Sequence, residues 1–325
     1  MSDDLRWLAA AAAIADCARP LSRPNPAVGA IIVKDGKVAG RGWTQAGGRP
    51  HAEAEALEQA GDAAQGATLY VTLEPCAHRS ERGPACAGLV AASGLARVVV
   101  GCEDPDPRTA GAGLARIREA GISADLVPSP EAEASLAGYL TAKRLGRPHV
   151  TLKLALSLDG CIALASGESQ WITGEAARAH SHAMRAKADA ILVGGGTLRA
   201  DNPRLDVRLP GLEDRSPERW VLTGGDAPEG WHALPSPDAI GEIEAVQYLF
   251  VEGGAQTAAV FLAADLVDSL LIYRAPIVIG GGLPSVTDLG LASLADAHGR
   301  WRLDERRQLG SDTLDVYSRT RCLPE

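Results

Sequence analysis

One histidine, one glutamate and two cysteines limit most strongly what this chain of 325 residues can fold into. His51 and Glu53 stand in the segment HAEAEALEQAG, and Cys76 and Cys86 stand in the segment TLEPCAHRSERGPACAGL. Zinc prefers imidazole nitrogen and thiolate sulfur as ligands, and a catalytic zinc site uses three protein ligands and keeps a fourth position for water. The sequence therefore predicts a zinc site made by His51, Cys76 and Cys86.

Glu53 favours a catalytic site over a structural one. It stands just beyond the histidine and outside the ligand set, so it can carry a proton from an attacking water to a departing amine. Zinc lowers the pKa of bound water and makes hydroxide available as the nucleophile. Two alternatives stay open: a structural zinc knot with His78 as fourth ligand, or a buried histidine beside two unrelated thiols. A closed structural site has no use for a glutamate that does not bind the metal.

Composition narrows the class of protein. The six cysteines are too sparse for a disulfide framework, and those outside the zinc set are interpreted as small core or surface residues: Cys17, Cys102, Cys161 and Cys322. The formal net charge is −9 and the basic residues are scattered, so nucleic acid is not an expected partner. No apolar run is long enough to span a membrane, and the opening LRWLAAAAAIADCA has no basic start typical of a signal peptide. We expect a cytoplasmic protein.

Strand and helix signals alternate along the chain, which predicts an α/β protein of roughly two domains. Pro148 and the fresh strand pattern VTLKLALSLDG mark a boundary, so we predict domains 1–146 and 147–325. In the first domain we expect strands over 27–36, 36–43, 67–75, 97–102 and 123–127. We expect helices over 4–18, from His51 onward, and over 86–94, 111–121 and 131–146.

The second half repeats the alternation with its own turn signals. We expect a helix over 171–188 capped by Thr173, a second helix over 255–265, and strands over 150–160, 188–196, 219–225, 248–254 and 269–282. Residues 209–245 are rich in proline, glycine and acidic groups around a single strand signal. This segment carries the least secondary-structure information in the chain.

The motifs HAE, EPC-A-H and P-A-C resemble the zinc deaminase superfamily. Nucleic-acid and cytidine deaminases usually carry the two cysteines as C-x-x-C, whereas a longer spacer separates them here. The segments RPNPAVGAIIV and CEDPDPRTAGAG narrow the resemblance to the riboflavin biosynthesis branch. That resemblance implies that Asn25 contacts the pyrimidine and that the loop carrying His78 shapes the pocket. The chain departs from the family pattern in two places: the spacer is one residue longer, and Asp106 stands where asparagine is usual.

Four segments of the second half follow strand signals, which is where open α/β sheets bind ligands: KLALSLDGCIAL, SGESQWIT, LVGGGTLRADNPRLDVR and FVEGGAQT. GGGTLRAD and EGGAQTAA are glycine-rich turns that run into helices and suit a phosphate or pyrophosphate. Neither matches a P-loop or the GxGxxG pattern. Taken one at a time, these segments also fit plain turns, and Lys153, Asp201 and Arg208 fit ordinary surface charges.

Taken together and in this order, the segments resemble the reductase domain of the bifunctional riboflavin biosynthesis enzymes, which has a dihydrofolate-reductase-like fold. The resemblance covers nearly the whole chain. It implies NADPH contacts at Ala155, Trp171, Thr197, Asp201 and the segment from Gly254, and substrate contacts at Ser169, Arg185, Leu205, Arg208 and Glu252. Thr223 is our additional candidate for a cofactor contact. Lys153 lies in the implied active site, and either Lys153 or Asp201 assists protonation while the cofactor delivers hydride.

Two further features bear on this domain. His180 and His182 share a helix, and an i, i+2 pair points to different helix faces, so we interpret both as surface or packing residues. Residues 209–247 are shorter than in the family by about one structural element. This shortening bears on NADPH binding and on contacts between subunits.

We therefore predict a bifunctional enzyme with a cytidine-deaminase-like α/β/α domain that binds Zn²⁺, followed by a dihydrofolate-reductase-like α/β domain that binds NADPH. The resemblance, and not the chain itself, implies a homodimer or a higher homo-oligomer. The first domain would deaminate 2,5-diamino-6-ribosylamino-4(3H)-pyrimidinone 5′-phosphate, and the second would reduce the ribosyl side chain to ribityl. One alternative is a nucleoside or RNA-editing deaminase with a binding module, which the cysteine spacing and acidic balance disfavour. Another is a deaminase whose second half serves only as a dimerisation scaffold.

Overall fold

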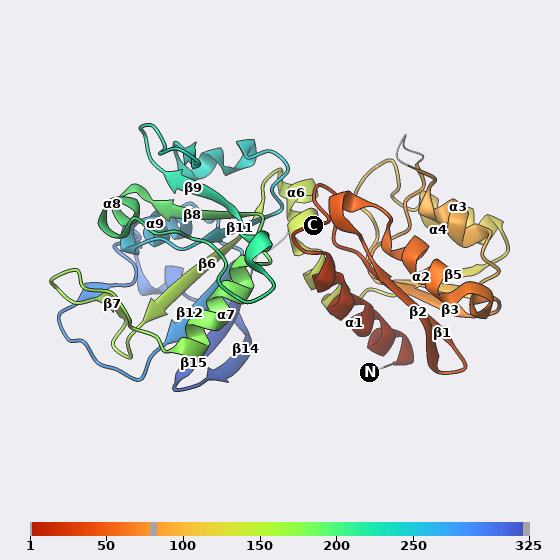
Figure 1. The fold of residues 1–325 in the computed structure, drawn as a ribbon, viewed down its shortest axis with the longest axis horizontal. Coiled ribbons are helices and arrows are strands. Elements are labelled where there is room, and N and C mark those ends of the chain that lie inside the picture. The colour runs from red at the N-terminus through yellow and green to blue at the C-terminus, as the bar shows by residue number, and fades with distance from the viewer. Residues whose placement is uncertain (1, 79–82, 321–325) are drawn as a thin grey trace. The chain divides into compact units, whose positions relative to one another are not determined.

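The computed structural model describes residues 2–78 and 83–320, and Cys322 lies outside them. The chain divides into two compact units, Met1–Arg147 and Pro148–Glu325, each built around its own sheet (Figure 1). None of the helices in the described part is long and apolar enough to cross a membrane.

The described residues of unit 1 form a five-stranded sheet in the order β2-β1-β3-β4-β5. β1 pairs antiparallel with β2 and β3, whereas β3, β4 and β5 run parallel. The strands are β1 (Gly29–Lys34), β2 (Lys37–Trp43), β3 (Thr68–Val71), β4 (Arg97–Val100) and β5 (Ser123–Leu126). The helices are α1 (Asp3–Ala15), α2 (Ala52–Ala60), α3 (Cys86–Ala91), α4 (Ala112–Glu119), α5 (Pro130–Ser135) and α6 (Ala137–Leu145).

Helices cover both faces of this sheet. On one face, Leu8 of α1 packs in a cluster with Tyr70 and Val99. On the other face a larger core joins the sheet to α2, α3, α4 and α6, with members that include Ala56, Val90, Ile117 and Leu140. The alternation of apolar residues along the strands therefore fills two cores at once, and the predicted α/β/α layering is confirmed.

A glycine lets α2 lie directly on the sheet. A Cβ atom at Gly42 of β2 would come within 2.4 Å of the carbonyl oxygen of Ala52, in the first turn of α2. Any side chain at this position would push the helix off the sheet. Because His51 is the N-cap residue of α2, this close approach also sets where His51 stands.

The described residues of unit 2 form an eight-stranded sheet in the order β10-β9-β8-β11-β6-β12-β15-β14 and a small two-stranded sheet of β7 and β13. The first six strands in this order, from β10 through β9, β8, β11 and β6 to β12, run parallel to one another. β15 pairs antiparallel with β12, and β14 pairs antiparallel with β15 at the edge of the sheet. The strands are β6 (His149–Leu156), β7 (Cys161–Ala163), β8 (Ala190–Gly194), β9 (Glu218–Leu222), β10 (His232–Leu234), β11 (Tyr248–Val251), β12 (Ser269–Arg274), β13 (Leu283–Pro284), β14 (Trp301–Leu309) and β15 (Asp312–Arg319).

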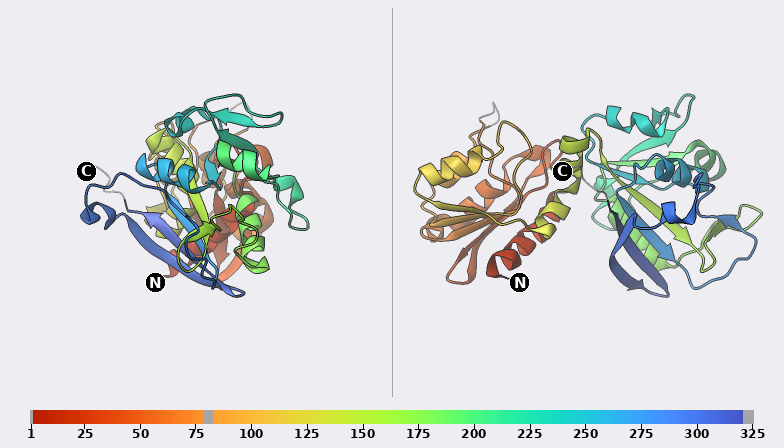
Figure 2. Two further views of the ribbon diagram at one scale, coloured as in Figure 1. Left: turned by 90° about the vertical axis from the view of Figure 1, so that its left-hand side faces the viewer. Right: turned by 180° about the vertical axis from the view of Figure 1, so that it is seen from behind.

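Three α-helices lie within the described part of unit 2: α7 (Glu175–Arg185), α8 (Gly195–Asp201) and α9 (Ala255–Ala263). Phe261 of α9 belongs to the core on one face of the large sheet, and Ala177 of α7 belongs to the core on the other. Figure 2 shows the large sheet with helices on its two sides. The carboxyl ends of β6, β8 and β11 meet at one edge, where a parallel sheet presents its ligand site.

Several predicted elements are corrected by the structure. The helix predicted over 131–146 is two helices, α5 and α6, which are separated at Leu136. The hairpin of β14 and β15 was not predicted, because β14 is an exposed, charge-rich edge strand without the apolar pattern of a strand. Thr173 does not cap α7. The N-cap residue is Gly174, whose backbone N–H donates to the Asp312 carboxylate at 2.7 Å, so a distant partner replaces the local cap.

Candidate functional site

Three candidate metal ligands of unit 1 meet at one point. The ligand atoms of His51, Cys76 and Cys86 all lie within 4.8 Å of one another. Nδ1 of His51 is 3.2 Å from Sγ of Cys86 and 3.8 Å from Sγ of Cys76. One imidazole nitrogen and two sulfurs form the donor set of a catalytic zinc site of the deaminase kind. The residues fit the zinc that the sequence predicts.

Two helix starts bring these ligands together. His51 is the N-cap of α2, Cys86 is the first residue of α3, and Cys76 follows β3. The backbone N–H of Cys86 donates to Sγ of Cys76 at 3.3 Å. Hydrogen bonding from the Cys86 thiol, together with His51, lowers the pKa of Cys76 to about 4. The thiolate form, which binds metal, is therefore favoured.

Glu53 stands beside the ligands in the first turn of α2. Its side chain is buried and lines the same cavity of about 300 Å³ as His51 and Cys76. Burial raises the pKa of the carboxyl group, which makes Glu53 a better proton acceptor than an exposed glutamate. The arrangement thus combines a triad that suits metal binding with a separate buried carboxyl group that suits proton transfer.

Asn25 faces the imidazole from the other side. Its Nδ2 donates to the carbonyl oxygen of Gly48 at 2.9 Å and lies 3.0 Å from Nε2 of His51. Gly48 has φ 86°, and a Cβ there would lie 2.6 Å from Cγ of Asn25, so a side chain at this position would displace the amide. Nδ1 of His51 is left to face the two sulfurs. Asn25 also lines the cavity, as the predicted pyrimidine contact requires.

Glu74 organises the loops of this site, a role that the sequence analysis missed. Its buried carboxylate accepts hydrogen bonds from the backbone N–H groups of Gly111 and Leu114, each at 3.0 Å. It therefore ties the segment before Cys76 to the start of α4. The signal was present in the EPC motif, where an acidic residue directly precedes Pro75 and Cys76 in an otherwise apolar run. His78 lines the cavity and lies 3.4 Å from Oγ1 of Thr109.

Asp106, the departure from the family's asparagine, is buried at the cavity wall. Its Oδ2 pairs with Nη2 of Arg108 at 2.6 Å and with Nζ of Lys143 at 3.1 Å. The hydrogen bond from Arg108, helped by Lys143, holds the pKa of Asp106 well below its usual range. The aspartate therefore places two cations on the wall of the deaminase cavity.

We expect Asp106→Asn to lower the free energy of unfolding by about 1 kcal/mol at neutral pH, because it weakens two partly exposed ion pairs. The folded-state pKa of Asp106 lies below its unfolded value, so this contribution is fully present above the unfolded pKa and disappears as the pH falls through the folded-state pKa. Urea unfolding of both proteins at several pH values measures the difference. A difference in unfolding free energy that stays constant down to the lowest pH would contradict the assignment of these ion pairs to Asp106.

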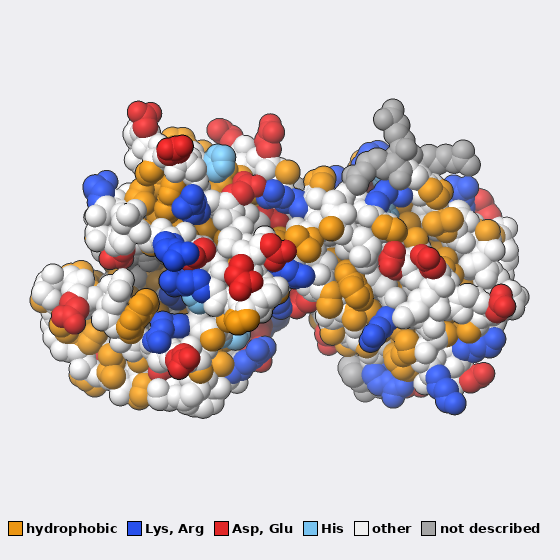
Figure 3. Space-filling view, in the orientation of Figure 1, with side chains coloured by type: hydrophobic (Ala, Val, Ile, Leu, Met, Phe, Trp, Pro, Cys, Tyr) orange, Lys and Arg blue, Asp and Glu red, His pale blue; other side chains and the backbone are white. Residues whose placement is uncertain are grey.

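Unit 2 contains a second cavity, of about 280 Å³, at the ends of β6, β8 and β11. Figure 3 shows basic side chains gathered around a hollow on the face of this unit that it displays. The basic residues of the cavity lining are Lys153, Arg178, Arg185 and Arg208. The lining brings together most residues that the sequence predicted for NADPH or substrate: Lys153, Ala155, Ser169, Trp171, Arg185, Thr197, Asp201, Leu205, Arg208, Glu252 and Gly254.

A buried carboxylate pairs two of these cations. Oε1 of Glu252 is 2.5 Å from Nε of Arg185, and Oε2 is 2.9 Å from Nη2 of Arg185 and 3.5 Å from Nζ of Lys153. Burial alone would raise the pKa of Glu252, but Lys153 and Arg185 outweigh it and lower the pKa to about 2. Glu252 therefore orients Arg185 and Lys153 inside the cavity.

We expect Glu252→Gln to lower the free energy of unfolding of unit 2 by about 3 kcal/mol, because removal of one partner leaves buried cations without their counter-charge. Differential scanning calorimetry of the whole protein measures this loss. Glu229→Gln, at an exposed position of the same unit, is the matched control and is expected to change little. Equal stabilities of the Glu252 and Glu229 variants would show that the buried pairing contributes nothing.

Three residues predicted to contact the cofactor, Gly254, Trp171 and Thr223, differ from one another in exposure and in their neighbours. The backbone N–H of Gly254, at the start of α9, donates to Oγ1 of Thr197 at 3.2 Å. The guanidinium of Arg178 lies 4.9 Å from the ring centre of Trp171, which is 65% exposed. Thr223 follows β9 and is absent from the residues lining the cavity in the described structure; its Oγ1 accepts from the N–H of Gly225 at 3.2 Å.

The two histidines of α7 differ from each other. Nδ1 of His180 lies 2.8 Å from the hydroxyl of Tyr273, which agrees with a packing role. His182 lines the cavity and contacts Arg208, which the interpretation as a surface or packing residue did not anticipate. The missed signal is the i, i+3 spacing of His182 and Arg185, which puts both side chains on the same helix face.

The fold and the two cavities define a class: a two-domain enzyme that joins a zinc-dependent deaminase site to a second α/β catalytic unit. Residues 1–102 match the cytidine and deoxycytidylate deaminase zinc-binding region, and residues 148–228 and 243–314 match the RibD C-terminal domain. The chain belongs to the RibD family of riboflavin biosynthesis proteins.

Known relatives match nearly the whole chain. The riboflavin biosynthesis protein RibD of Escherichia coli is 39% identical over 360 residues, covering 95% of this chain and 97% of that protein. The Aquifex aeolicus protein of the same description is 35% identical and covers 97% and 98%. A solved structure of Acinetobacter baumannii RibD, form 1, has a TM-score of 0.85 at 34% identity and covers 98% of this chain and 99% of that chain.

Proposed function

We propose that unit 1 deaminates 2,5-diamino-6-ribosylamino-4(3H)-pyrimidinone 5′-phosphate at the site of His51, Cys76 and Cys86, and that unit 2 then reduces the ribosyl side chain to ribityl. The protein is a bifunctional riboflavin biosynthesis enzyme, a zinc-dependent hydrolase and an NADPH-dependent oxidoreductase. The observation that carries the residue assignment is the burial of Glu53 at a cavity that is also lined by His51 and Cys76, two members of the nitrogen and sulfur triad.

In the deaminase step, water adds to the ring carbon that bears the amine, and the amine leaves as ammonia. Bound at His51, Cys76 and Cys86, zinc would supply Lewis-acid activation of the attacking water. Glu53 takes a proton from that water and passes it to the departing amine, so one carboxyl group serves both halves of the step. Asn25 holds the pyrimidine, because its amide is fixed by Gly48 at the cavity wall.

In the reductase step, C1′ of the ring-opened sugar imine accepts a hydride, which bound NADPH would supply, and the imine nitrogen takes a proton. We assign the proton to Lys153, because its pairing with Glu252 holds it inside the cavity, whereas Asp201 is exposed at the end of α8. We propose the remaining contacts as follows: Ala155, Trp171, Thr197, Asp201, Thr223 and Gly254 for NADPH, and Ser169, Arg185, Leu205, Arg208 and Glu252 for the substrate.

The substrate is a small molecule, and we propose that the enzyme is cytoplasmic and works as a homo-oligomer without nucleic acid. The alternative, in which unit 2 is only a dimerisation scaffold, does not explain why its charged residues gather at a cavity. Glu252, Arg185 and Lys153 pair with one another and line a cavity together with Arg178 and Arg208, and such a basic lining suits an anionic ligand.

A mass spectrum of the product tests the proposal. The zinc-loaded protein is incubated with the diaminopyrimidine ribosyl phosphate and NADPH. Deamination replaces an amine nitrogen by oxygen, and reduction adds two hydrogens, so the steps leave separable mass changes. Both changes are expected. Deamination alone would favour the scaffold alternative.

A further inference from the structure

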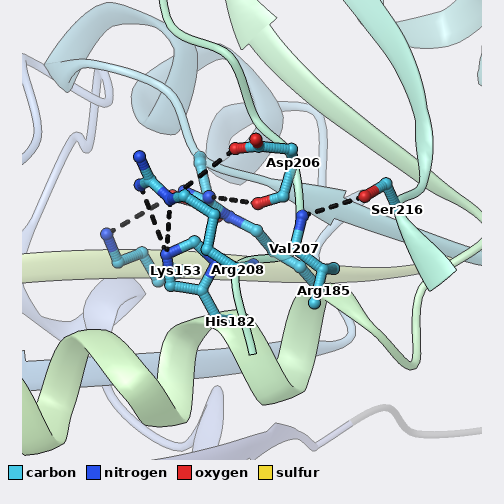
Figure 4. Close-up of polar contacts among 8 residues, drawn as sticks. Lys153, His182, Arg185, Asp206, Val207, Arg208 and Ser216 are labelled. Atoms are coloured by element: carbon cyan, nitrogen blue, oxygen red, sulfur yellow. Dashed lines mark hydrogen bonds and ion pairs between the residues drawn. The ribbon is translucent and has the colours of Figure 1, made fainter. Parts of the chain in front are cut away.

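His182 projects from α7 into the reductase cavity beside Arg208 (Figure 4). Three contacts join the two residues. The backbone N–H of Arg208 lies 3.2 Å from Nδ1 of the imidazole, while Nε and Nη2 of its guanidinium lie 3.4 Å and 3.3 Å from Nε2. A neutral imidazole has only one acceptor nitrogen, so these contacts cannot all be hydrogen bonds at once.

The backbone contact is the one that the fold holds in place. The carbonyl oxygen of Asp206 accepts from Nη1 of Arg185 at 3.1 Å, and the N–H of Val207 donates to Oγ of Ser216 at 2.9 Å. Figure 4 shows both contacts flanking the chain as it reaches Arg208. The N–H of Arg208 is therefore fixed against Nδ1, whereas its guanidinium lies at the end of a flexible side chain.

This geometry determines where His182 carries its proton. Burial, together with Arg185 and Arg208, lowers the pKa of His182 and favours the neutral ring. With the backbone contact made, Nδ1 is the acceptor and the single proton of the neutral ring is on Nε2. The backbone carbonyl of Asp206 is a further acceptor for the ring and opposes the lowering of its pKa. Nε2–H and the guanidinium N–H groups are then donors that converge on the same side of the cavity.

The charges around these donors favour an anion. Glu252 already pairs with both Arg185 and Lys153. Asp206 lies 3.7 Å from Nε of Arg208 but 2.5 Å from Nη2 of Arg204, so its carboxylate is shared between two arginines. An oxygen that carries negative charge would satisfy both His182 and Arg208.

We propose that His182 is a phosphate ligand of the reductase site, donating from Nε2 to the 5′-phosphate of the ribosyl substrate alongside the guanidinium of Arg208. The inference rests on the proposed reductase function. It assigns to His182 a direct contact with substrate. The 2′-phosphate of NADPH has the same chemistry, so the experiment must distinguish the two sources.

Steady-state reduction of the deaminated ribosyl phosphate by His182→Leu and His182→Gln tests this role. Leucine removes the donor, and the KM for the ribosyl phosphate is expected to rise about 10-fold, the effect of losing one hydrogen bond to a charged group, with kcat little changed. Glutamine offers both an amide oxygen for the N–H of Arg208 and an amide donor, so its KM is expected to stay within about 3-fold of wild type. The KM for NADPH should be unchanged.

Two further variants show whether the effect is specific to His182. His298→Leu, at an exposed position outside the cavity lining in the described residues, should behave as wild type. His182→Ala removes the donor without placing a large apolar side chain in the cavity, and it replaces His182→Leu if the latter does not fold. Protein that folds but keeps a wild-type KM for the ribosyl phosphate would overturn the proposal.

Other outcomes also decide against it. A raised KM for NADPH but not for NADH, with the ribosyl phosphate unaffected, would place the cofactor phosphate at His182. A failure of glutamine to restore KM would reduce His182 to a packing residue. Failure of the wild-type protein to reduce the substrate at all would instead refute the proposed reductase function, so the two failures are separate.

Discussion

Glu53→Gln is expected to reduce deamination by at least about 1,000-fold while zinc stays bound, because the amide cannot accept a proton from water or return it to the amine. The substitution keeps the shape of the side chain in its buried position. The rate is measured as ammonia release from the diaminopyrimidine ribosyl phosphate, and the metal by elemental analysis of the same sample.

Glu58→Gln is the matched control for this experiment. Glu58 lies on α2 like Glu53 but is exposed, so its variant should deaminate at the wild-type rate. The reductase step, assayed on the deaminated intermediate, should persist in both variants, because unit 2 has its own core and cavity. Deamination by Glu53→Gln within a few-fold of wild type would refute the proton-carrier role.

Cys86→Ser is expected to lose zinc and with it all measurable deamination, because a serine hydroxyl is a poor replacement for a thiolate ligand in a three-ligand site. The substitution also removes the thiol beside Cys76, so the pKa of Cys76 should rise towards its ordinary value. Elemental analysis after dialysis measures the metal content, and a thiol titration of the metal-free protein measures the change at Cys76.

Cys17→Ser provides the comparison, since Cys17 is an exposed cysteine away from the ligand cluster. It should keep its zinc and both activities. A full zinc complement in Cys86→Ser would show that the third ligand is a different residue. Loss of the reductase step in Cys86→Ser would show that the two units depend on each other for folding.

Much of the fold could be predicted from local patterns. The hairpin of β1 and β2 and the buried strands β4, β8 and β11 appear as apolar segments bounded by turn residues, and the structure contains each of them. The prediction failed where a partner far along the chain replaced a local signal. Gly174 begins α7 because Asp312 binds its N–H, and the charge-rich β14 is a strand because it pairs with β15.

The residues of the candidate sites also fall into those that the sequence could predict and those that only the structure shows. Residue types and order in HAE, EPC and PAC were enough to predict the three ligands that the structure brings together, and Glu53 beside them, because few other side chains suit that chemistry. Most residues that the order of the reductase motifs identified likewise line the second cavity. The role of Glu74, by contrast, depends on backbone N–H groups of residues 111 and 114, which no local pattern connects to it.

The sequence by itself determined which chemical groups this protein has: a nitrogen and sulfur triad, a glutamate close to it, and cations of a kind that suits a phosphate. Only the tertiary structure decided how these groups are paired. Lys143 forms an ion pair with Asp106, and Glu252 forms ion pairs with both Arg185 and Lys153. The backbone N–H of Arg208 contacts the imidazole of His182. The physical reason is that a hydrogen bond or ion pair depends on distance and direction over a few ångströms. Residues far apart in the chain acquire these only when the sheets and helices have packed.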